Sequence, residues 1–271
     1  MTGDIFLFLV QDGLVNGAIY ALLALTFVLV FTVTRILFVP QGEFVTFGAL
    51  TYASMQIGVV PGSVWLVAAG AAIVAAQDLV ATVRARNHRR IVPILLRHVL
   101  LPGVVVAAVV WAAPLKLHPV ILLVLSAALV TLMGPLLYRL AFRPVADASV
   151  LALLIVAVAV HFALQGFGLL FFGAEGFRGA PLFDAQVGIG PLLVTGQQIT
   201  VLLSTVILVF ALYFFFGRAI LGKALRATAV SRLGARLIGF RAEVAGEVAF
   251  ALAAFVGAVS GSPPCTTIPG S

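Results

Sequence analysis

The sequence predicts an all-α, polytopic helical integral membrane protein with about eight transmembrane spans. Hydrophobic residues make up 63% of the 271 residues, charged residues only 9%, and the mean hydropathy is +1.23. Apolar runs recur along the chain, and a run of roughly 20 such residues crosses the hydrocarbon core as a helix. Most basic residues lie between these runs. This pattern excludes a soluble globular protein. We expect membrane lipid, and no nucleic acid, as a partner in spite of the net charge of +7.

Eight apolar segments give the expected spans. The second resumes after an interruption at Pro40-Gln-Gly42-Glu43, where a proline, a glycine and a carboxylate predict a broken or re-entrant helix. The polar segment 173–196 is expected to be an outer loop with a short helix or a re-entrant turn. The expected spans are 5–34, 44–57, 64–83, 93–113, 120–138, 148–172, 199–216 and 244–260.

The basic residues predict the orientation of these spans. With the N-terminus outside, all 16 Lys and Arg except Lys116 and Arg178 fall in cytoplasmic loops or at their edges. The opposite orientation would invert this distribution, against the positive-inside rule. The first apolar run is preceded by no positive charge, so it is expected to be a retained span and not a cleaved signal peptide.

Segment 217–243 is the longest stretch too polar to remain in the bilayer. Apolar residues recur in it every fourth position, so a helix would stack them as one ridge: Leu225, Ala229, Leu233 and Leu237. Basic residues flank that ridge: Lys223, Arg226, Arg232 and Arg236. Such a helix suits docking onto a soluble partner or lying on an acidic lipid surface, and the segment alone leaves both open.

The same segment contains an incomplete phosphate-binding loop pattern. Gly217 to Lys223 matches G-x-x-x-x-G-K, but Ala224 lacks the hydroxyl that would reach magnesium. A span, not a strand, precedes it. We therefore expect this chain to bind no ATP of its own.

Polar side chains inside the predicted spans are candidates for a translocation path, because they are costly in hydrocarbon. Glu43 is expected either to line a water-filled path, to pair with a basic residue or to sit near a membrane surface. Arg35, eight residues earlier, is close enough in sequence to pair with it at the membrane interface. His161 and Gln165 lie one helical turn apart on the same face. The pair would either relay protons or bind a ligand, or it would hydrogen-bond to a neighbouring helix. The path candidates are Asn16, Gln41, Glu43, His161 and Gln165.

Two further patterns concern packing and charge. Gly13-Leu-Val-Asn-Gly17 is a small-xxx-small spacing that lets two helix backbones approach closely. Asp78 precedes the basic cluster Arg84–Arg90, which predicts a carboxylate held near the inner surface by those arginines.

Enzymatic and metal chemistry are not expected. Cys265 is the single cysteine, and the four histidines show no ligand spacing. No catalytic residues, metal ligands or cofactors are predicted.

Four motifs, taken in order, resemble the permeases of branched-chain amino acid ABC importers (the LivH type). They are Gly13-Leu-Val-Asn-Gly17-Ala-Ile-Tyr20, Gly42-Glu43-Phe, Tyr138-Arg-Leu-Ala-Phe-Arg143-Pro144, and Gly222-Lys-Ala-Leu-Arg226-Ala-Thr-Ala229 followed by Ala235-Arg-Leu-Ile-Gly239. The resemblance covers residues 10 to 261, and 1–261 is expected to be one transmembrane permease domain.

The resemblance implies a non-enzymatic subunit in a bacterial inner membrane, with its N-terminus in the periplasm. It implies four kinds of partner: a second related permease, two ATP-binding subunits that hydrolyse ATP, a periplasmic solute-binding protein, and lipid. It favours a protein partner for segment 217–243, whose helix would dock into a cleft of the ATPase. The residues carried over by position for this coupling are Lys223, Arg226, Leu233, Ala235, Arg236 and Gly239.

The sequence departs from the family in three places. Phe38-Val-Pro-Gln-Gly42 replaces Asn-Phe-Ala-His-Gly, which puts the substrate preference in doubt. Leu233-Gly-Ala235 replaces Glu-Ala-Ala, which removes an acidic residue from the docking loop. Residues 262–271 form an atypical proline-rich tail where family members continue, so we expect a frameshifted or truncated C-terminal end.

Two other classes of protein remain as alternatives. A secondary transporter or channel for a small polar solute would need carboxylates inside the bilayer, and Glu43 and Asp78 are its candidates. A membrane-embedded enzyme would need facing catalytic side chains, and His161 has no matching Ser, Asp or second His at a helical spacing.

Overall fold

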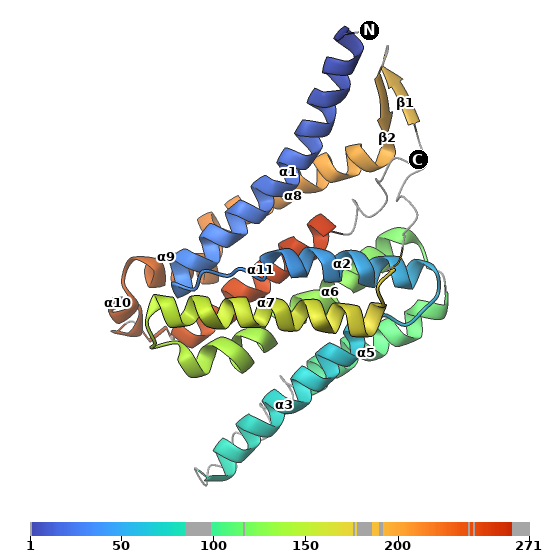
Figure 1. Cartoon of the computed structure of the whole chain (residues 1–271). Helices are drawn as coiled ribbons and strands as arrows, with labels where there is room; N and C mark the ends of the chain where they lie inside the picture. Colours follow the sequence, from blue (N-terminus) through green and yellow to red (C-terminus); the bar gives the residue numbers. More distant parts are fainter. Residues whose placement is uncertain are drawn as a thin grey trace.

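The computed structural model describes residues 2–84, 99–115, 117–175, 177, 186–189, 192–237, 239–240 and 242–261. The fold is all-α apart from one small hairpin (Figure 1). The helices are α1 (Thr2–Thr34), α2 (Gln41–Gln56), α3 (Ser63–Arg84), α5 (Leu101–Ala112), α6 (Pro119–Leu137), α7 (Val150–Phe172), α8 (Gly196–Arg218), α9 (Ile220–Val230), α10 (Arg232–Leu237) and α11 (Ala242–Gly261). The chain's proline-rich tail, 262–271, lies outside the described residues.

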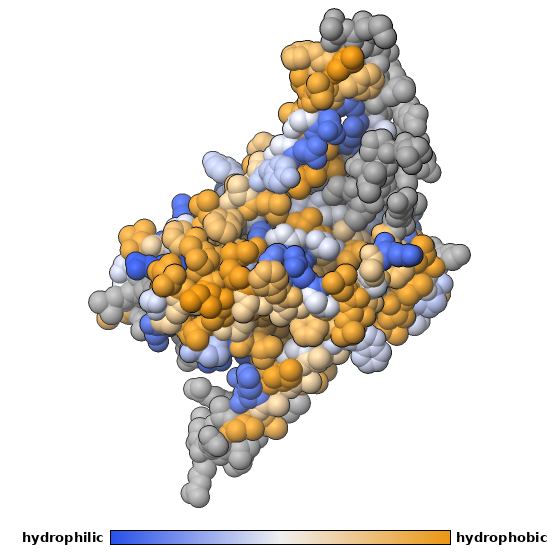
Figure 2. All heavy atoms as spheres, in the orientation of Figure 1, coloured by the Kyte–Doolittle hydropathy of each residue, from blue (hydrophilic) through white to orange (hydrophobic). Residues whose placement is uncertain are grey.

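Within the described residues, six helices are long and apolar enough to cross a membrane, so the chain is a multi-pass membrane protein. They correspond to six of the eight expected spans and lie at 5–34, 63–80, 119–145, 150–172, 198–218 and 243–261. Figure 2 shows the apolar surface that such helices present.

The other two expected spans are not among these six. α2 has 16 residues, and the described part of the fourth expected span is the apolar stretch Leu101–Leu115, which is α5 followed by one 3-10 turn. α2 is largely buried against other helices. The described residues therefore support six of the predicted spans, and the crossings expected at 44–57 and 93–113 stay predictions.

Helix α11 is the centre of the bundle, packed against α6, α2 and α1. It approaches α6 closely at Gly134, where an added Cβ would lie 2.3 Å from the carbonyl oxygen of Phe250. Membrane helices commonly gain packing energy where small residues let their backbones approach closely. Lipid tails are as apolar as the helices, so the hydrophobic effect does not drive the helices together.

Aromatic side chains fill the core beside that contact. The ring of Phe38 lies 4.6 Å from Phe250 and 5.4 Å from Phe44, centroid to centroid, and Phe142 packs edge-on against it. Phe38 belongs to the non-helical connection between α1 and α2. The predicted break at Pro40 is confirmed, because α1 ends at Thr34 and α2 begins at Gln41.

The helix ends that the charge pattern assigns to the cytoplasm gather at one end of the bundle (left in Figure 1). There α1 ends, α7 and α11 begin, and α9 and α10 lie. Thr34 and Arg35 from the end of α1 share a small cavity with Asp147 and Ser149 from the α6–α7 connection. This gathering agrees with alternating spans, while the side on which the N-terminus lies stays a prediction.

Segment 173–196, expected to be an outer loop with a short helix or a re-entrant turn, is described only in part. That part contains an antiparallel hairpin, β1 (Gln186–Ile189) with β2 (Leu192–Thr195), which the sequence analysis did not predict. The β-branched residues Val187, Ile189 and Val194 favour strands.

The small-residue pattern in α1 makes no close contact with the described part of the chain. A Cβ added at Gly13 or Gly17 would meet nothing within 4 Å. The close helix approach predicted for this pair is therefore absent within the described chain.

Candidate functional site

The candidate coupling segment folds as two short helices, α9 and α10, held between the end of α8 and the start of α11. Gly222, Leu225 and Thr228 are the buried face of α9. A Cβ at Gly222 would lie 2.2 Å from the carbonyl oxygen of Phe215, so this glycine lets α9 fold tightly onto α8. The residues that resemble a phosphate-binding loop thus lie in a helix that follows a helix, which agrees with the sequence-based rejection of ATP binding.

The predicted apolar ridge is split between two faces. Leu225 is fully buried against the chain's own bundle and Ala235 is 2% exposed, so neither is free to dock onto a partner. Leu237, at the other end of the ridge, is 81% exposed, and Ile220 and Val230 of the same segment are 85% and 90% exposed. Leu225 is therefore not available for docking, whereas Leu237 stays a docking candidate and the side chain of Leu233 lies outside the described part of the structure.

The remaining predicted coupling residues fall into three groups. Lys223 and Arg226 are exposed on α9. Leu233 and Arg236 lie in α10, and their side chains are outside the described part of the structure. Gly239 follows α10 with φ 86°.

Gly239 ends α10 through its backbone. The Phe240 N–H donates to the carbonyl of Ala235 at 2.9 Å, which with a glycine at positive φ is the pattern of a Schellman C-terminal cap. The motif position carried over for coupling therefore has a structural role in stopping the helix.

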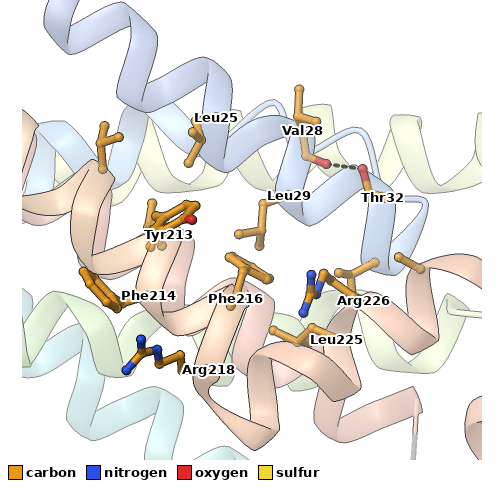
Figure 3. Close-up of a pocket in the computed structure, with 15 residues that line it drawn as sticks. Leu25, Val28, Leu29, Thr32, Tyr213, Phe214, Phe216, Arg218, Leu225 and Arg226 are labelled. Atoms are coloured by element: carbon orange, nitrogen blue, oxygen red, sulfur yellow. Dashed lines mark hydrogen bonds between the residues drawn. The ribbon is translucent and has the colours of Figure 1, made fainter.

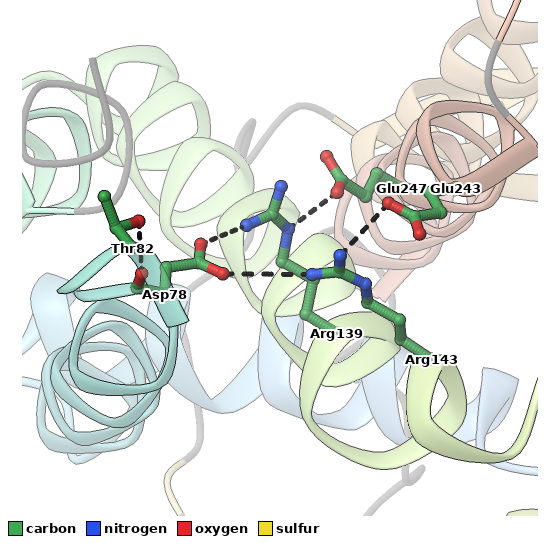
Figure 4. A network of polar contacts seen from close by, with 6 residues as sticks. All are labelled: Asp78, Thr82, Arg139, Arg143, Glu243 and Glu247. Atoms are coloured by element: carbon green, nitrogen blue, oxygen red, sulfur yellow. Dashed lines mark hydrogen bonds and ion pairs between the residues drawn. The ribbon is translucent and has the colours of Figure 1, made fainter. Parts of the chain in front are cut away.

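A polar network joins α3, the end of α6 and the start of α11, the helix that follows this segment in the chain (Figure 4). The Arg139 guanidinium donates to Asp78 Oδ2 at 2.8 Å and to Glu247 Oε1 at 2.6 Å. Arg143, one helical turn further, donates to Glu243 at 3.1 Å and lies 3.8 Å from Asp78. Five charged side chains are thus joined in one network: Asp78 of α3, Glu243 and Glu247 of α11, Arg139 of the π-helical turn Tyr138–Phe142 after α6, and Arg143 of the 3-10 turn that follows.

The network adds residues that the sequence analysis missed. The described partners of Asp78 are Arg139 and Arg143, while the basic cluster predicted to hold it falls mostly outside the described residues. A signal was present in the sequence: Arg139 and Arg143 are four residues apart, and so are Glu243 and Glu247. Two helix ends with matched spacing present two complementary pairs of charges.

A second polar cluster joins α2 to α7. Glu43 Oε1 lies 3.2 Å from His161 Nδ1, and the Nε2 atoms of His161 and Gln165 are 3.2 Å apart. When the Gln165 amide donates to His161 Nε2, the imidazole proton is on Nδ1 and faces the carboxylate. The predicted partner of Glu43, Arg35, was wrong, since the base beside it is His161.

This cluster can bind a cation or pass a proton. The carboxylate of Glu43 is 11% exposed and the His161 side chain 26%, so the pair is screened from solvent but reachable. A carboxylate and an imidazole side by side offer oxygen acceptors and a ring nitrogen that can carry a proton. The structure therefore brings together three of the five path candidates.

The other two path candidates lie elsewhere. Gln41 is buried and donates from Nε2 to the carbonyl of Ala253 at 3.1 Å, so it ties α2 to α11. Asn16 is exposed on α1, outside the cluster. Among the described residues, no group of three or more His, Cys, Asp or Glu could hold a metal ion.

Comparison of the chain with protein-family models, with curated proteins and with solved structures finds no match.

Proposed function

We propose that this chain is the permease subunit of an ATP-driven importer of the branched-chain amino acid type. Its spans would form part of the translocation path, and α9–α10 would dock onto an ATP-binding subunit. A second related permease, two such ATPases and a periplasmic solute-binding protein complete the assembly, in a bacterial inner membrane. The proposal rests on the resemblance of the motifs and on the shape of the coupling segment.

The observation that carries the proposal is the exposed apolar tip of α9–α10. Ile220, Val230 and Leu237 present apolar side chains to water at the end of the bundle where the basic residues gather. Apolar side chains rimmed by charge, such as that of Lys223, are the composition of a protein interface. A purely structural loop would not leave three aliphatic side chains exposed together.

The packing offers a route from this tip to the path. α9 contacts α1, α8 and α11, and α11 is the central helix of the bundle. Arg139 joins the first turns of α11 to α3 and to the end of α6. A rigid movement of α9–α10 by an ATPase would therefore displace α11 against the polar cluster of Glu43, His161 and Gln165, which lies on the α2–α7 side of the path.

Co-purification tests the docking. The chain is expressed with the ATP-binding subunits encoded by its neighbouring genes, and the variants Val230→Asp and Leu237→Asp are compared with wild type in detergent. We expect the wild type to retain the ATPase and both variants to lose it, since each places a carboxylate in an apolar contact. Val59→Asp is the matched control, because Val59 is an exposed valine in the connection after α2, at the other end of the bundle. Retention by Val230→Asp, or equal loss by Val59→Asp, would contradict the docking.

One observation favours a second candidate, a proton-coupled secondary transporter or channel. The pair Glu43–His161 places a carboxylate beside an imidazole inside the bundle, a combination that ion-coupled carriers use. Proteoliposomes that contain the chain alone separate the two candidates. Leucine uptake driven by a proton gradient without any ATPase, and lost in Glu43→Gln, would replace the importer proposal. Uptake that requires ATP and the ATPases supports it.

A further inference from the structure

A groove of about 800 Å³ runs between α1, α8 and α9 (Figure 3). Its walls are aliphatic and aromatic, among them Leu25, Leu29 and Phe216. From Leu25 to Val33 the groove follows about 12 Å of helix α1, at 1.5 Å per residue.

Arg226 and Thr32 lie at one end of this groove, and Arg218 lines its α8 wall with the guanidinium turned toward Phe214 (Figure 3). Arg218 is the last residue of α8, Arg226 is on the adjoining turn of α9, and Thr32 is close to the end of α1. The Arg218 guanidinium lies 5.7 Å from the centroid of the Phe214 ring, which keeps it beside the groove wall. Among the described residues no carboxylate forms an ion pair with either arginine.

The position of the groove in the bilayer follows from its walls. α1 and α8 are both candidate spans, so the apolar part of the groove lies at hydrocarbon depth. Arg218 ends α8, and Arg226 lies in the polar segment that follows it. This is the level of the lipid headgroups. An occupant must therefore be apolar along its length and anionic at the headgroup end.

We infer that this groove binds an anionic phospholipid of the membrane. One acyl chain lies along α1 and α8 against Leu25 and Leu29, the phosphodiester is held by the guanidinium of Arg226, and the positive charge of Arg218 at the end of α8 adds to the attraction. Basic pockets between membrane helices are suited to anionic headgroups, because the phosphate oxygens accept from arginine donors in a fork. The inference does not depend on the proposed function. It gives Arg226 a lipid contact in place of the ATPase contact that its motif position implies.

Native mass spectrometry of the full chain in neutral detergent tests this site. The protein is titrated with phosphatidylglycerol and with phosphatidylcholine of the same acyl chains, and bound lipid is counted as adduct mass. We expect phosphatidylglycerol to be retained in preference. Arg218→Gln and Arg226→Gln should each weaken it about fivefold, and the double variant about 25-fold, since a basic residue near the headgroups contributes about that factor.

Two further variants separate the groove from general surface charge. Lys223→Gln removes an exposed cation from the same helix that does not line the groove, and should leave binding unchanged. Ala229→Phe fills the groove with both arginines intact, and should abolish the preference while the elution volume of the protein stays that of wild type. Equal retention of the two lipids, or equal losses in Lys223→Gln and Arg226→Gln, would overturn the inference. A mass of two protein chains without lipid would show a subunit interface there instead.

Discussion

Arg139 is expected to be the most costly single charge to remove from this protein. Its side chain is 13% exposed and bridges Asp78, at 21%, and Glu247, at 5%. Arg139→Met deletes the cation and leaves two carboxylates that were desolvated in its presence. Breaking a buried ion pair from one side costs about 3 to 5 kcal/mol, because the other charge keeps its desolvation penalty.

The free energy of unfolding measured by denaturant titration in detergent micelles gives this cost. Arg143→Met is the matched control, because its side chain is 40% exposed and its partner Glu243 is 54% exposed. Solvent screens such a pair, so the control should lose at most about 1 kcal/mol.

The double variant Arg139→Met with Glu247→Met tests the pairing itself. Removing both charges together should cost less than the sum of the two single losses, because Glu247 no longer remains as a buried charge without its partner and Asp78 keeps Arg143 3.8 Å away. The reasoning is refuted if Arg139→Met costs no more than Arg143→Met, or if the two single losses simply add.

Two glycines give further predictions. Gly134→Ala should lower the free energy of unfolding by about 1 to 3 kcal/mol, because its Cβ would meet a backbone oxygen of α11 at 2.3 Å. Gly103→Ala is the control and should be neutral or stabilising, because its Cβ would meet nothing within 4 Å. Equal effects of the two variants in the same denaturant titration would refute the close contact. Gly239→Ala should cost about 1 to 2 kcal/mol of local stability at φ 86°, seen as faster amide hydrogen exchange in α10. Gly217→Ala, which has open space and ordinary φ, should not change that exchange.

Composition and charge alone determined the class of this protein and much of its layout. An apolar run long enough to cross a membrane forms a helix there, because a helix satisfies the hydrogen bonds of its own backbone within the segment. Within the described residues, six of the eight predicted runs have that length. The break before α2 followed from Pro40, and the gathering of basic segments at one end followed from alternation.

The tertiary structure decided which side chains meet. The partner of Glu43 is His161, far along the chain, and not Arg35, eight residues away. A described partner of Asp78 is Arg139, 61 positions along the chain. In a membrane the core-facing and lipid-facing sides of a helix are both apolar, so hydropathy does not reveal which face packs. For the same reason Leu225 read as a docking residue although it fills the interior. Contacts between helices depend on their crossing, which a linear pattern does not contain.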